Sequence, residues 1–278
     1  MSAAGLERDL DLAFALADAA DEVTLGGFLT DVAVEWKQDL TPVTEVDRRA
    51  ETVIRELLAE HRPSDAVHGE EHADTGAGSR RWVIDPIDGT KNYVRGVPVW
   101  ASLISLSVDD RVEVAVVSAP ALSRRWWAVR GEGAHMAWAG GAGGAGGAAA
   151  LGSAREPRRL CVSRVAALDD ASVSYSSLAG WTELGLEPGF LELLRSTWRQ
   201  RALGDFWSYM LLAEGAVDIA AEPEVPLYDL AAVSLIVEEA GGQFTNIAGV
   251  PGPAGGSAVA TNGLLQQRVL DTLAAAPH

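Results

Sequence analysis

An apolar strand that runs into two aspartates restricts how this chain can fold. The segment is Trp82-Val-Ile-Asp-Pro-Ile-Asp-Gly-Thr90. Its strand residues lead into Asp85, and Asp88 follows three residues later at a turn that contains a proline and a glycine. Two carboxylates at the mouth of one strand repel each other unless a proton or a cation lies between them. The segment therefore predicts either an ordinary acidic turn or a site for a hard divalent cation such as Mg²⁺.

The N-terminal half predicts two helices followed by a set of strands. Apolar residues recur at helical spacing from Leu6 to Phe28, which indicates a long amphipathic helix. A second helix is expected after Thr41-Pro42, because proline suits the first turn of a helix, and Pro63 would end it. Strands are expected at 82–84, 101–108, 112–117 and 125–130, with a hairpin turn at Asp109-Asp110.

The C-terminal half predicts strands that alternate with helices. Strands are expected at 160–163, 172–176 and 217–221, and helices at 190–199, 206–214 and 230–240. Antiparallel pairs in the first half and crossovers in the second favour a mixed α/β (α+β) layered sandwich over a barrel. A length of 278 residues suits one large domain or two closely packed halves.

The charge and cysteine content exclude several classes of protein. The chain has 39 acidic and 22 basic side chains, a formal charge of −17. This excess repels phosphate backbones and anionic lipids, so we expect no nucleic-acid or membrane partner. The single cysteine, Cys161, rules out an intramolecular disulfide framework and is typical of a reducing compartment. The first 14 residues are charged where a signal peptide would be apolar, so we expect a cytoplasmic protein.

A long uncharged stretch interrupts the middle of the chain. The stretch Gly133–Ala154 carries no formal charge and is long enough to cross a bilayer. It consists almost entirely of glycine and alanine, which favours a flexible low-complexity loop at 139–154 over a membrane span.

Further acids and a glycine turn accompany the two aspartates. Glu70 and Glu71 follow the strand candidate Val67-His68, which places acids at a second strand end. Asp229 begins the last long helix and is either an N-cap or a ligand, and Asp47 fits a Thr-x-x-Asp capping box. Beyond Asp88, a glycine turn exposes backbone N–H groups that favour an anion if a helix starts there. Cation and anion receptors side by side are what a phosphate-ester enzyme needs.

Taken together, four segments resemble the inositol monophosphatase superfamily of Mg²⁺-dependent phosphatases. They are Asp39-Leu-Thr-Pro-Val-Thr-Glu-Val-Asp47, Gly69-Glu-Glu71, Trp82-Val-Ile-Asp-Pro-Ile-Asp-Gly-Thr90 and Tyr228-Asp-Leu-Ala-Ala-Val-Ser-Leu-Ile-Val-Glu-Glu-Ala-Gly-Gly242. The resemblance implies that residues 1–278 form a single phosphatase domain, a layered α-β-α-β-α sandwich with approximate halves 1–150 and 151–278. It also implies a homodimer.

The same resemblance implies roles for individual residues. Two or three Mg²⁺ ions would be held by the carboxylates of Glu70, Asp85, Asp88 and Asp229 and by the backbone carbonyl of Ile87. Three residues would be catalytic, with the attacking water held and deprotonated by Asp47 and Thr90, and with Glu70 beside them. The N–H groups of Gly89 and Thr90 would bind phosphate oxygens. No phosphoenzyme is expected.

Within the superfamily, the chain is most similar to the histidinol-phosphate phosphatases of the actinobacterial type. The stretches that suggest this are 88–103, 118–127 and 204–206, while Tyr228 departs from a signature that usually has Trp. The implied substrate, L-histidinol phosphate, carries a cationic amine and an imidazole, so its pocket should offer carboxylates outside the metal site. Asp205 and Glu222 are the candidates, although either fits a solvated or capping acid equally well. Asn92 and Arg95 are weaker candidates for the same pocket.

Several other functions remain as alternatives. Within the phosphatases, they are hydrolysis of inositol 1-monophosphate, 3′-phosphoadenosine 5′-phosphate or fructose 1,6-bisphosphate. A binding or assembly protein on a phosphatase fold is a further possibility. The Asp-x-x-Asp spacing is one residue too long for phosphatases with an aspartyl nucleophile. His68-Gly-Glu-Glu-His72 matches the inverted zinc-protease pattern, which needs a helix that Gly69 argues against.

Overall fold

The computed structural model describes residues 3–31, 33–36, 42–138 and 156–274. Its helices are α1 (Ala3–Gly27), α2 (Glu45–His61), α3 (Thr90–Val94), α5 (Ala179–Glu183), α6 (Glu187–Arg195), α7 (Asp205–Ala213), α8 (Leu227–Glu239) and α9 (Gln266–Ala274), with 3-10 turns η1 (Pro120–Leu122) and η2 (Leu168–Asp170). Its strands are β1 (Val34–Trp36), β2 (Pro42–Thr44), β3 (Ala66–Gly69), β4 (Arg80–Asp88), β5 (Ala101–Val108), β6 (Arg111–Ala119), β7 (Arg124–Val129), β8 (Gly133–Trp138), β9 (Arg158–Arg159), β10 (Ser172–Ser174), β11 (Arg199–Arg201), β12 (Ile219–Glu222), β13 (Gln243–Thr245) and β14 (Ala258–Thr261).

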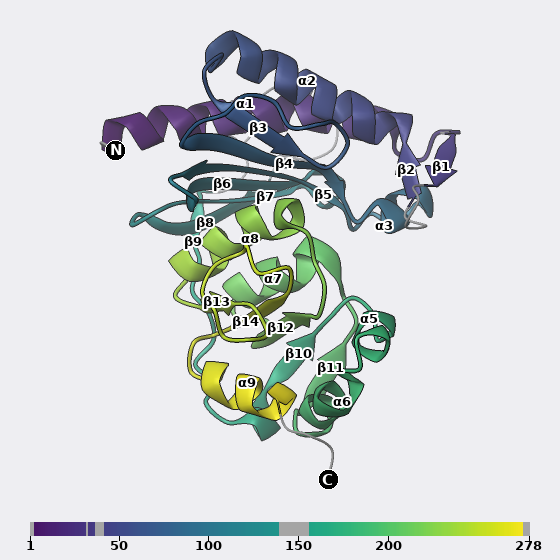
Figure 1. Cartoon of the computed structure of the whole chain (residues 1–278), viewed down its shortest axis with the longest axis vertical. Helices are drawn as coiled ribbons and strands as arrows, with labels where there is room; N and C mark the ends of the chain where they lie inside the picture. The colour runs from purple at the N-terminus through teal and green to yellow at the C-terminus, as the bar shows by residue number, and fades with distance from the viewer. Residues whose placement is uncertain (1–2, 32, 37–41, 139–155, 275–278) are drawn as a thin grey trace.

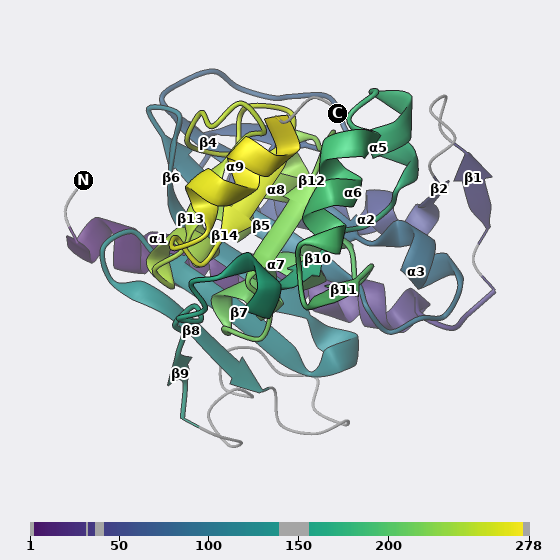
Figure 2. The ribbon, with the colours of Figure 1, turned by 90° about the horizontal axis from the view of Figure 1, so that it is seen from below.

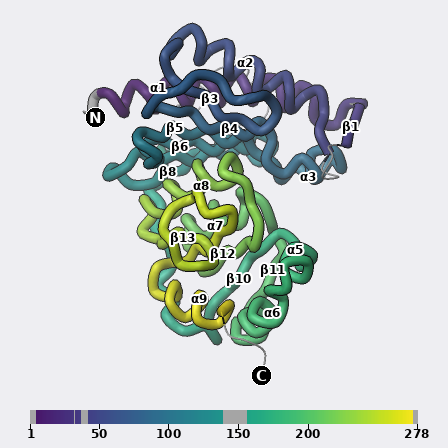
Figure 3. Tube along the Cα trace, viewed as in Figure 1, coloured from purple at the N-terminus to yellow at the C-terminus, as the bar shows by residue number. Residues whose placement is uncertain are grey.

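These elements stack in five alternating layers (Figure 1). Helices α1 and α2 cover one face of a seven-stranded sheet, and α7 and α8 lie between that sheet and a five-stranded one. Helices α5, α6 and α9 cover the outer face of the second sheet, as the view from below shows (Figure 2). In the tube of Figure 3, the N-terminal part of the chain makes the upper layers and the C-terminal part the lower ones. The predicted α-β-α-β-α sandwich is confirmed.

The seven-stranded sheet is buried on both faces, which explains its nearly continuous apolar strands. Its order is β3-β4-β5-β6-β7-β8-β9, and only the β3–β4 pair is parallel. Alternate residues face opposite helices, so Ile84 packs in the cluster with α1 while Val83 packs in the cluster with α8. The four strands predicted here are present, and Asp109-Asp110 forms their hairpin turn with positive φ at both residues.

The five-stranded sheet combines parallel and antiparallel pairs in the order β11-β10-β12-β14-β13. The strand predicted at 160–163 is wrong. The Leu160 N–H donates to the Ala134 carbonyl and the Val162 N–H to the Ala240 carbonyl, so the segment connects β8 with the end of α8 and joins no ladder. The helix predicted at 190–199 ends at Arg195, because Arg199 already pairs in β11.

The second helix begins three residues later than proline predicted. Pro42 lies in β2, and α2 starts at Glu45 because Thr44 and Asp47 form a complete capping box. At the other end the helix stops at His61, before Pro63. The capping signal was therefore the better guide to this helix than the proline.

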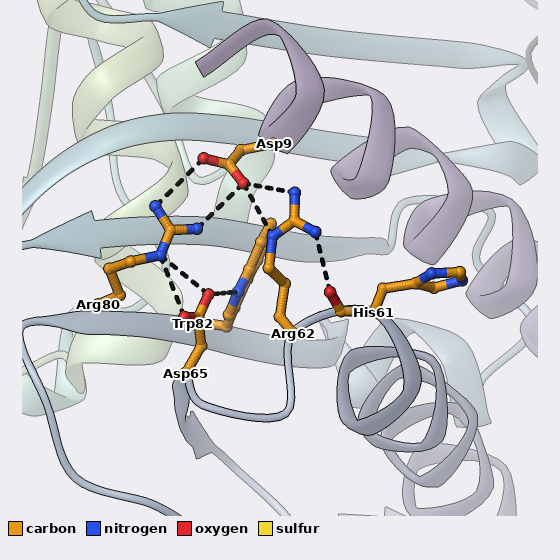
Figure 4. Close-up of polar contacts among 6 residues, drawn as sticks. All are labelled: Asp9, His61, Arg62, Asp65, Arg80 and Trp82. Atoms are coloured by element: carbon orange, nitrogen blue, oxygen red, sulfur yellow. Dashed lines mark hydrogen bonds and ion pairs between the residues drawn. The ribbon is translucent and has the colours of Figure 1, made fainter. Parts of the chain in front are cut away.

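A network of ion pairs fastens α1 and α2 to the start of β4 (Figure 4). Asp9 of α1 accepts hydrogen bonds from Arg62, which follows α2, and from Arg80 of β4, each at 3.0 Å. Asp65 accepts from Arg80 at 3.1 Å and from the indole of Trp82 at 3.0 Å. Both carboxylates are therefore matched with arginines from neighbouring elements.

The uncharged stretch begins as a strand. Residues 133–138 form β8, which pairs with β7, and the loop predicted at 139–154 lies outside the described residues. In the ranges that the structure covers, no helix has the length and apolar character needed to cross a membrane.

Candidate metal centre and active site

A bulge at the end of β4 turns two aspartates toward the same side of the sheet. Side chains three residues apart on a regular strand point to opposite faces. Here Asp85 pairs with Leu103 but Asp88 with Ala101, so β4 carries one extra residue between the two pairs. The Ile87 N–H donates to Asp85 at 2.9 Å, and the Ser102 hydroxyl donates to the Pro86 carbonyl at 2.7 Å. These bonds fix the irregular turn that the sequence Asp-Pro-Ile-Asp-Gly encodes.

A third carboxylate, Asp229, reaches the same point from α8. Ligand oxygens of Asp85, Asp88 and Asp229 all lie within 4.8 Å of one another. Pro226 occupies the N-cap position of α8 and Asp229 lies in the first turn, so the N-cap interpretation of Asp229 is wrong. The pKa values of Asp85 and Asp88 are raised well above normal, first by burial and then by neighbouring acids.

This donor set fits a hard divalent cation. Asp85 and Asp88 are only 1% and 7% exposed. Within the described ranges, no arginine or lysine forms an ion pair with either of them. Buried carboxylate oxygens that converge without a basic partner are the ligands that Mg²⁺ takes in proteins.

Glu70 joins this cluster from the neighbouring strand. Strand β3 runs parallel to β4 with Gly69 beside Ile84, so Glu70 leaves the sheet next to Asp85. Glu70 hydrogen-bonds with Asp85 and its charge raises the pKa of that carboxyl after burial does. The site therefore draws acids from two strand ends, as the sequence predicted.

A buried glutamate on α2 holds the segment that carries Glu70. Glu51 accepts the Glu71 N–H at 2.7 Å and pairs with Arg55 at 2.6 Å. Its carboxylate lies so close to Gly69 that a Cβ there would come within 2.1 Å of it, which explains the glycine. Sequence periodicity placed a helix here but gave no reason for a buried acid on it.

Asp47 both caps α2 and faces the site, so its two interpretations do not compete. Its Oδ2 accepts the Thr44 N–H at 2.8 Å, which completes the cap. Its Oδ1 accepts a long hydrogen bond, 3.4 Å, from the Thr90 hydroxyl, which also lies 3.0 Å from the Ile87 carbonyl. Burial raises the pKa of Asp47 most, and the nearby charge of Glu70 raises it further.

The turn after Asp88 opens the short helix α3. Gly89 adopts a left-handed conformation with φ of 85°, and a Cβ there would lie 3.1 Å from the Val99 carbonyl. The first N–H groups of a helix have no partner within it, so Thr90 and its neighbours present donors beside the acidic cluster.

A pocket of about 220 Å³ with acidic walls adjoins the cluster of Asp85, Asp88 and Asp229, and the last two of these also line the pocket. Asp205, in a left-handed conformation with φ of 49°, accepts a hydrogen bond from Asn92 at 3.2 Å. Glu222 accepts the Ser176 N–H at 2.5 Å, and burial raises the pKa of Glu222 to about 8. The Phe206 N–H donates to Asp88 at 2.5 Å and joins pocket to cluster.

Two other candidates lie apart from this arrangement. Arg95 is exposed and lines a separate cavity with Gly27 and Leu29, so the structure does not bring it to Asp205 and Glu222. His68 lies in strand β3 and hydrogen-bonds with Asp74, whereas His72 hydrogen-bonds with Thr52. The two histidines therefore share no helical face, and the match to the zinc-protease pattern is a coincidence. Ser176 and Tyr209 line the pocket although no sequence pattern singled them out.

Comparison with known proteins agrees with this geometry. The sequence profile of the inositol monophosphatase family matches residues 6–278. The chain belongs to this family. A histidinol-phosphatase from Mycobacterium tuberculosis is 55% identical over 267 residues, which cover 95% of this chain and 97% of the relative. A histidinol-phosphatase from Streptomyces coelicolor is 54% identical over 270 residues, covering 95% and 96%.

A solved structure in the family has the same fold. The inositol monophosphatase from Zymomonas mobilis superposes with a TM-score of 0.82 at 28% identity, covering 98% of this chain and 99% of that one. The family assignment predicted from the four motifs is therefore confirmed, and so is the layered sandwich that it implied.

Proposed function

We propose that this chain is a Mg²⁺-dependent phosphomonoesterase that hydrolyses L-histidinol phosphate to L-histidinol and phosphate. The observation that carries the proposal is the pairing of two acidic sites through Asp88, one suited to a cation and one suited to a cationic substrate group. The two histidinol-phosphatases at 54% and 55% identity support the same substrate.

The cation site would be filled by two or three Mg²⁺ ions. Glu70, Asp85, Asp88, Asp229 and the Ile87 carbonyl would hold them, since carboxylate and carbonyl oxygens are the ligands Mg²⁺ prefers. When bound, Mg²⁺ supplies positive charge that offsets the phosphoryl and leaving-group oxygens and lowers the pKa of the attacking water. Backbone N–H groups of Gly89 and Thr90 would bind the remaining phosphoryl oxygens.

Thr90 and Asp47 would move the proton from the attacking water. The Thr90 hydroxyl has one proton and two acceptors in reach, the Ile87 carbonyl at 3.0 Å and Asp47 Oδ1 at 3.4 Å. With the Ile87 carbonyl bound to a cation, the hydroxyl would donate to Asp47, and its oxygen would be left to accept a hydrogen bond from water. The proton would reach Asp47 Oδ1, whose raised pKa makes it a better base than an exposed aspartate. Glu70, at the side of the cluster, would orient the same water. No covalent intermediate is needed.

Asp205 and Glu222 would bind the ammonium group of the substrate. Both are carboxylates with raised pKa values in a pocket that adjoins the phosphoryl site, and a cationic group would offset the cost of charging them. Asn92 would orient Asp205 through their hydrogen bond. Arg95 has no part in this proposal, since it lines another cavity.

We further propose a homodimeric enzyme of histidine biosynthesis that works in the cytoplasm. The family resemblance supports the dimer, the substrate supports the biosynthetic role, and the lone Cys161 suits a reducing compartment. Size-exclusion chromatography with light scattering would test the dimer.

The substrate is tested by comparing kcat/KM across small phosphate esters. The panel is L-histidinol phosphate, inositol 1-phosphate, 3′-phosphoadenosine 5′-phosphate and fructose 1,6-bisphosphate, each with Mg²⁺. We expect L-histidinol phosphate to be preferred by about 100-fold or more, because only it matches both acidic carboxylates with a cation, an advantage of about 3 kcal/mol. Equal or higher kcat/KM for inositol 1-phosphate would disprove the proposed substrate.

A further inference from the structure

The hydroxyl of Tyr209 is buried beside the substrate pocket without a hydrogen-bond partner among the described residues. Tyr209 is 3% exposed, and its ring packs against Phe244 with 5.7 Å between centroids. Tyr209 and Asp205 both belong to α7, and both line this pocket. The ring is therefore anchored in the core while its polar end meets the acids of the pocket.

An unpaired buried hydroxyl is costly and needs an explanation. Nearly all buried polar groups in proteins have a partner, and leaving one unpaired costs about 1–3 kcal/mol. Four carboxylates around the pocket disfavour ionisation of Tyr209, and its pKa is raised well above normal, first by burial. Tyr209 therefore stays a neutral phenol, which can donate one hydrogen bond to a group that enters the pocket.

The chemistry of the pocket limits what that group can be. Asp205 and Glu222 offer acceptors, so they select a donor such as an ammonium group, which has no lone pair for Tyr209. The partner of the phenol must be a different, neutral atom that carries a lone pair. An imidazole ring near neutral pH has one such nitrogen, since its other nitrogen carries the proton.

We propose that Tyr209 is a specificity residue whose hydroxyl donates to the unprotonated imidazole nitrogen of the substrate. This inference rests on the proposed function, because it assigns the second polar group of L-histidinol phosphate to a residue outside the metal site. Asp205 and Glu222 take the amine, Tyr209 takes the ring, and both interactions use side chains that adjoin the phosphoryl site.

The test is the substitution Tyr209→Phe, which removes only the hydroxyl. We expect KM for L-histidinol phosphate to rise about tenfold with kcat changed less than about threefold, since one hydrogen bond is worth about 1.4 kcal/mol. The inhibition constant of L-histidinol should rise by a similar factor. Inorganic phosphate has no ring, so its inhibition constant should not change.

Thermal unfolding separates this role from a structural one. Tyr209→Phe removes a hydroxyl that makes no hydrogen bond within the described residues, so the Tm of the substrate-free protein should stay the same or rise. The matched control is Tyr93→Phe, because Tyr93 is also buried and its hydroxyl donates to the Thr24 carbonyl at 2.8 Å. Tyr93→Phe loses this hydrogen bond and should have a lower Tm.

Two results would overturn the inference. One is a KM for L-histidinol phosphate and an inhibition constant for L-histidinol that both stay within twofold of wild type in Tyr209→Phe. The other is a fall in Tm as large as that of Tyr93→Phe, which would mean that the hydroxyl has a partner within the fold. If wild type itself fails to hydrolyse L-histidinol phosphate but hydrolyses another ester, the proposed function has failed and the imidazole assignment fails with it.

Discussion

At the start of β4, Asp65 accepts hydrogen bonds from Arg80 and Trp82, whereas at the end of the same strand Asp85 and Asp88 face other carboxylates. The first group, with Asp9, is matched with Arg62, which follows α2, and with Arg80 of β4, and it holds α1 and α2 in place (Figure 4). The second group has no basic partner within the described ranges and is deeply buried. The difference indicates that one set of acids completes the fold, while the other is suited to the cations that we propose for it.

The largest effect on activity is expected from removing a carboxylate at the end of β4, where the acids have no basic partner among the described residues. Asp85→Asn should lower kcat/KM by about 10³-fold or more, since a ligand to the proposed cations is lost. The metal-free protein should nevertheless unfold at a higher temperature at pH 8. Asp85 has a raised pKa in the fold, so its charged form destabilises the folded state and a neutral Asn does not. Steady-state kinetics and thermal unfolding in EDTA measure both changes; a lower Tm would contradict the account.

Glu222 provides a buried acid outside both groups, and its effect depends on pH. Its pKa rises from 4.5 to about 8 on folding, so the stability it contributes is complete below pH 4.5 and is lost as pH rises through 8. Glu222→Gln should remove this pH dependence, about 4 kcal/mol between pH 4.5 and 8. Urea unfolding across that range in EDTA is the measurement. The exposed neighbour Glu224 is the control, and Glu224→Gln should behave as wild type.

At the start of β4, where Asp65 pairs with Arg80, an Asp-to-Asn substitution should lower stability and leave activity unchanged. Asp65→Asn leaves Arg80 with a weaker partner and should lower the free energy of unfolding by about 2 kcal/mol, less than for a fully buried pair because Arg80 is partly exposed. Its kcat and KM should remain at wild-type values below Tm. Loss of activity without loss of stability would remove the distinction between the two ends of β4.

The smallest effect is expected at Glu51, which holds the segment of Glu70. Glu51→Ala removes the acceptor of the Glu71 N–H and should weaken Mg²⁺ binding about tenfold. Glu51→Gln keeps an acceptor and should bind Mg²⁺ nearly as wild type does. Calorimetric titration of Mg²⁺ into EDTA-treated protein compares the three. Equal affinities for wild type and Glu51→Ala would mean that Glu51 only supports the fold.

The parts that the sequence predicted are those with a strong local signal. The long apolar runs of β4 to β6 and the helix α8 were predicted because burial on both sides leaves a continuous apolar pattern. The segment 160–163 has the same pattern but pairs with no strand, since its N–H groups bond to carbonyls on two separate elements. A local apolar pattern indicates that a segment is buried, but it does not indicate which element the segment pairs with.

The candidate site divides in the same way. The acids of the candidate metal site all stand in motifs, but for Asp229 the start of α8 had to be known before capping could be excluded. Tyr209 reads as one more core residue of α7, since helical periodicity shows a buried position but not an unpaired hydroxyl. Glu51 is likewise hidden in a helix whose other buried positions are mostly apolar. Such residues become visible only when the contacts of each polar atom are known.

The most direct test of the two-ended account is phosphate release from L-histidinol phosphate by EDTA-treated wild-type protein as Mg²⁺ is returned. Because Asp85 and Asp88 of β4 have no basic partner among the described residues, we expect no turnover without the cation and a saturable recovery as Mg²⁺ is added. Undiminished phosphate release in EDTA would contradict it.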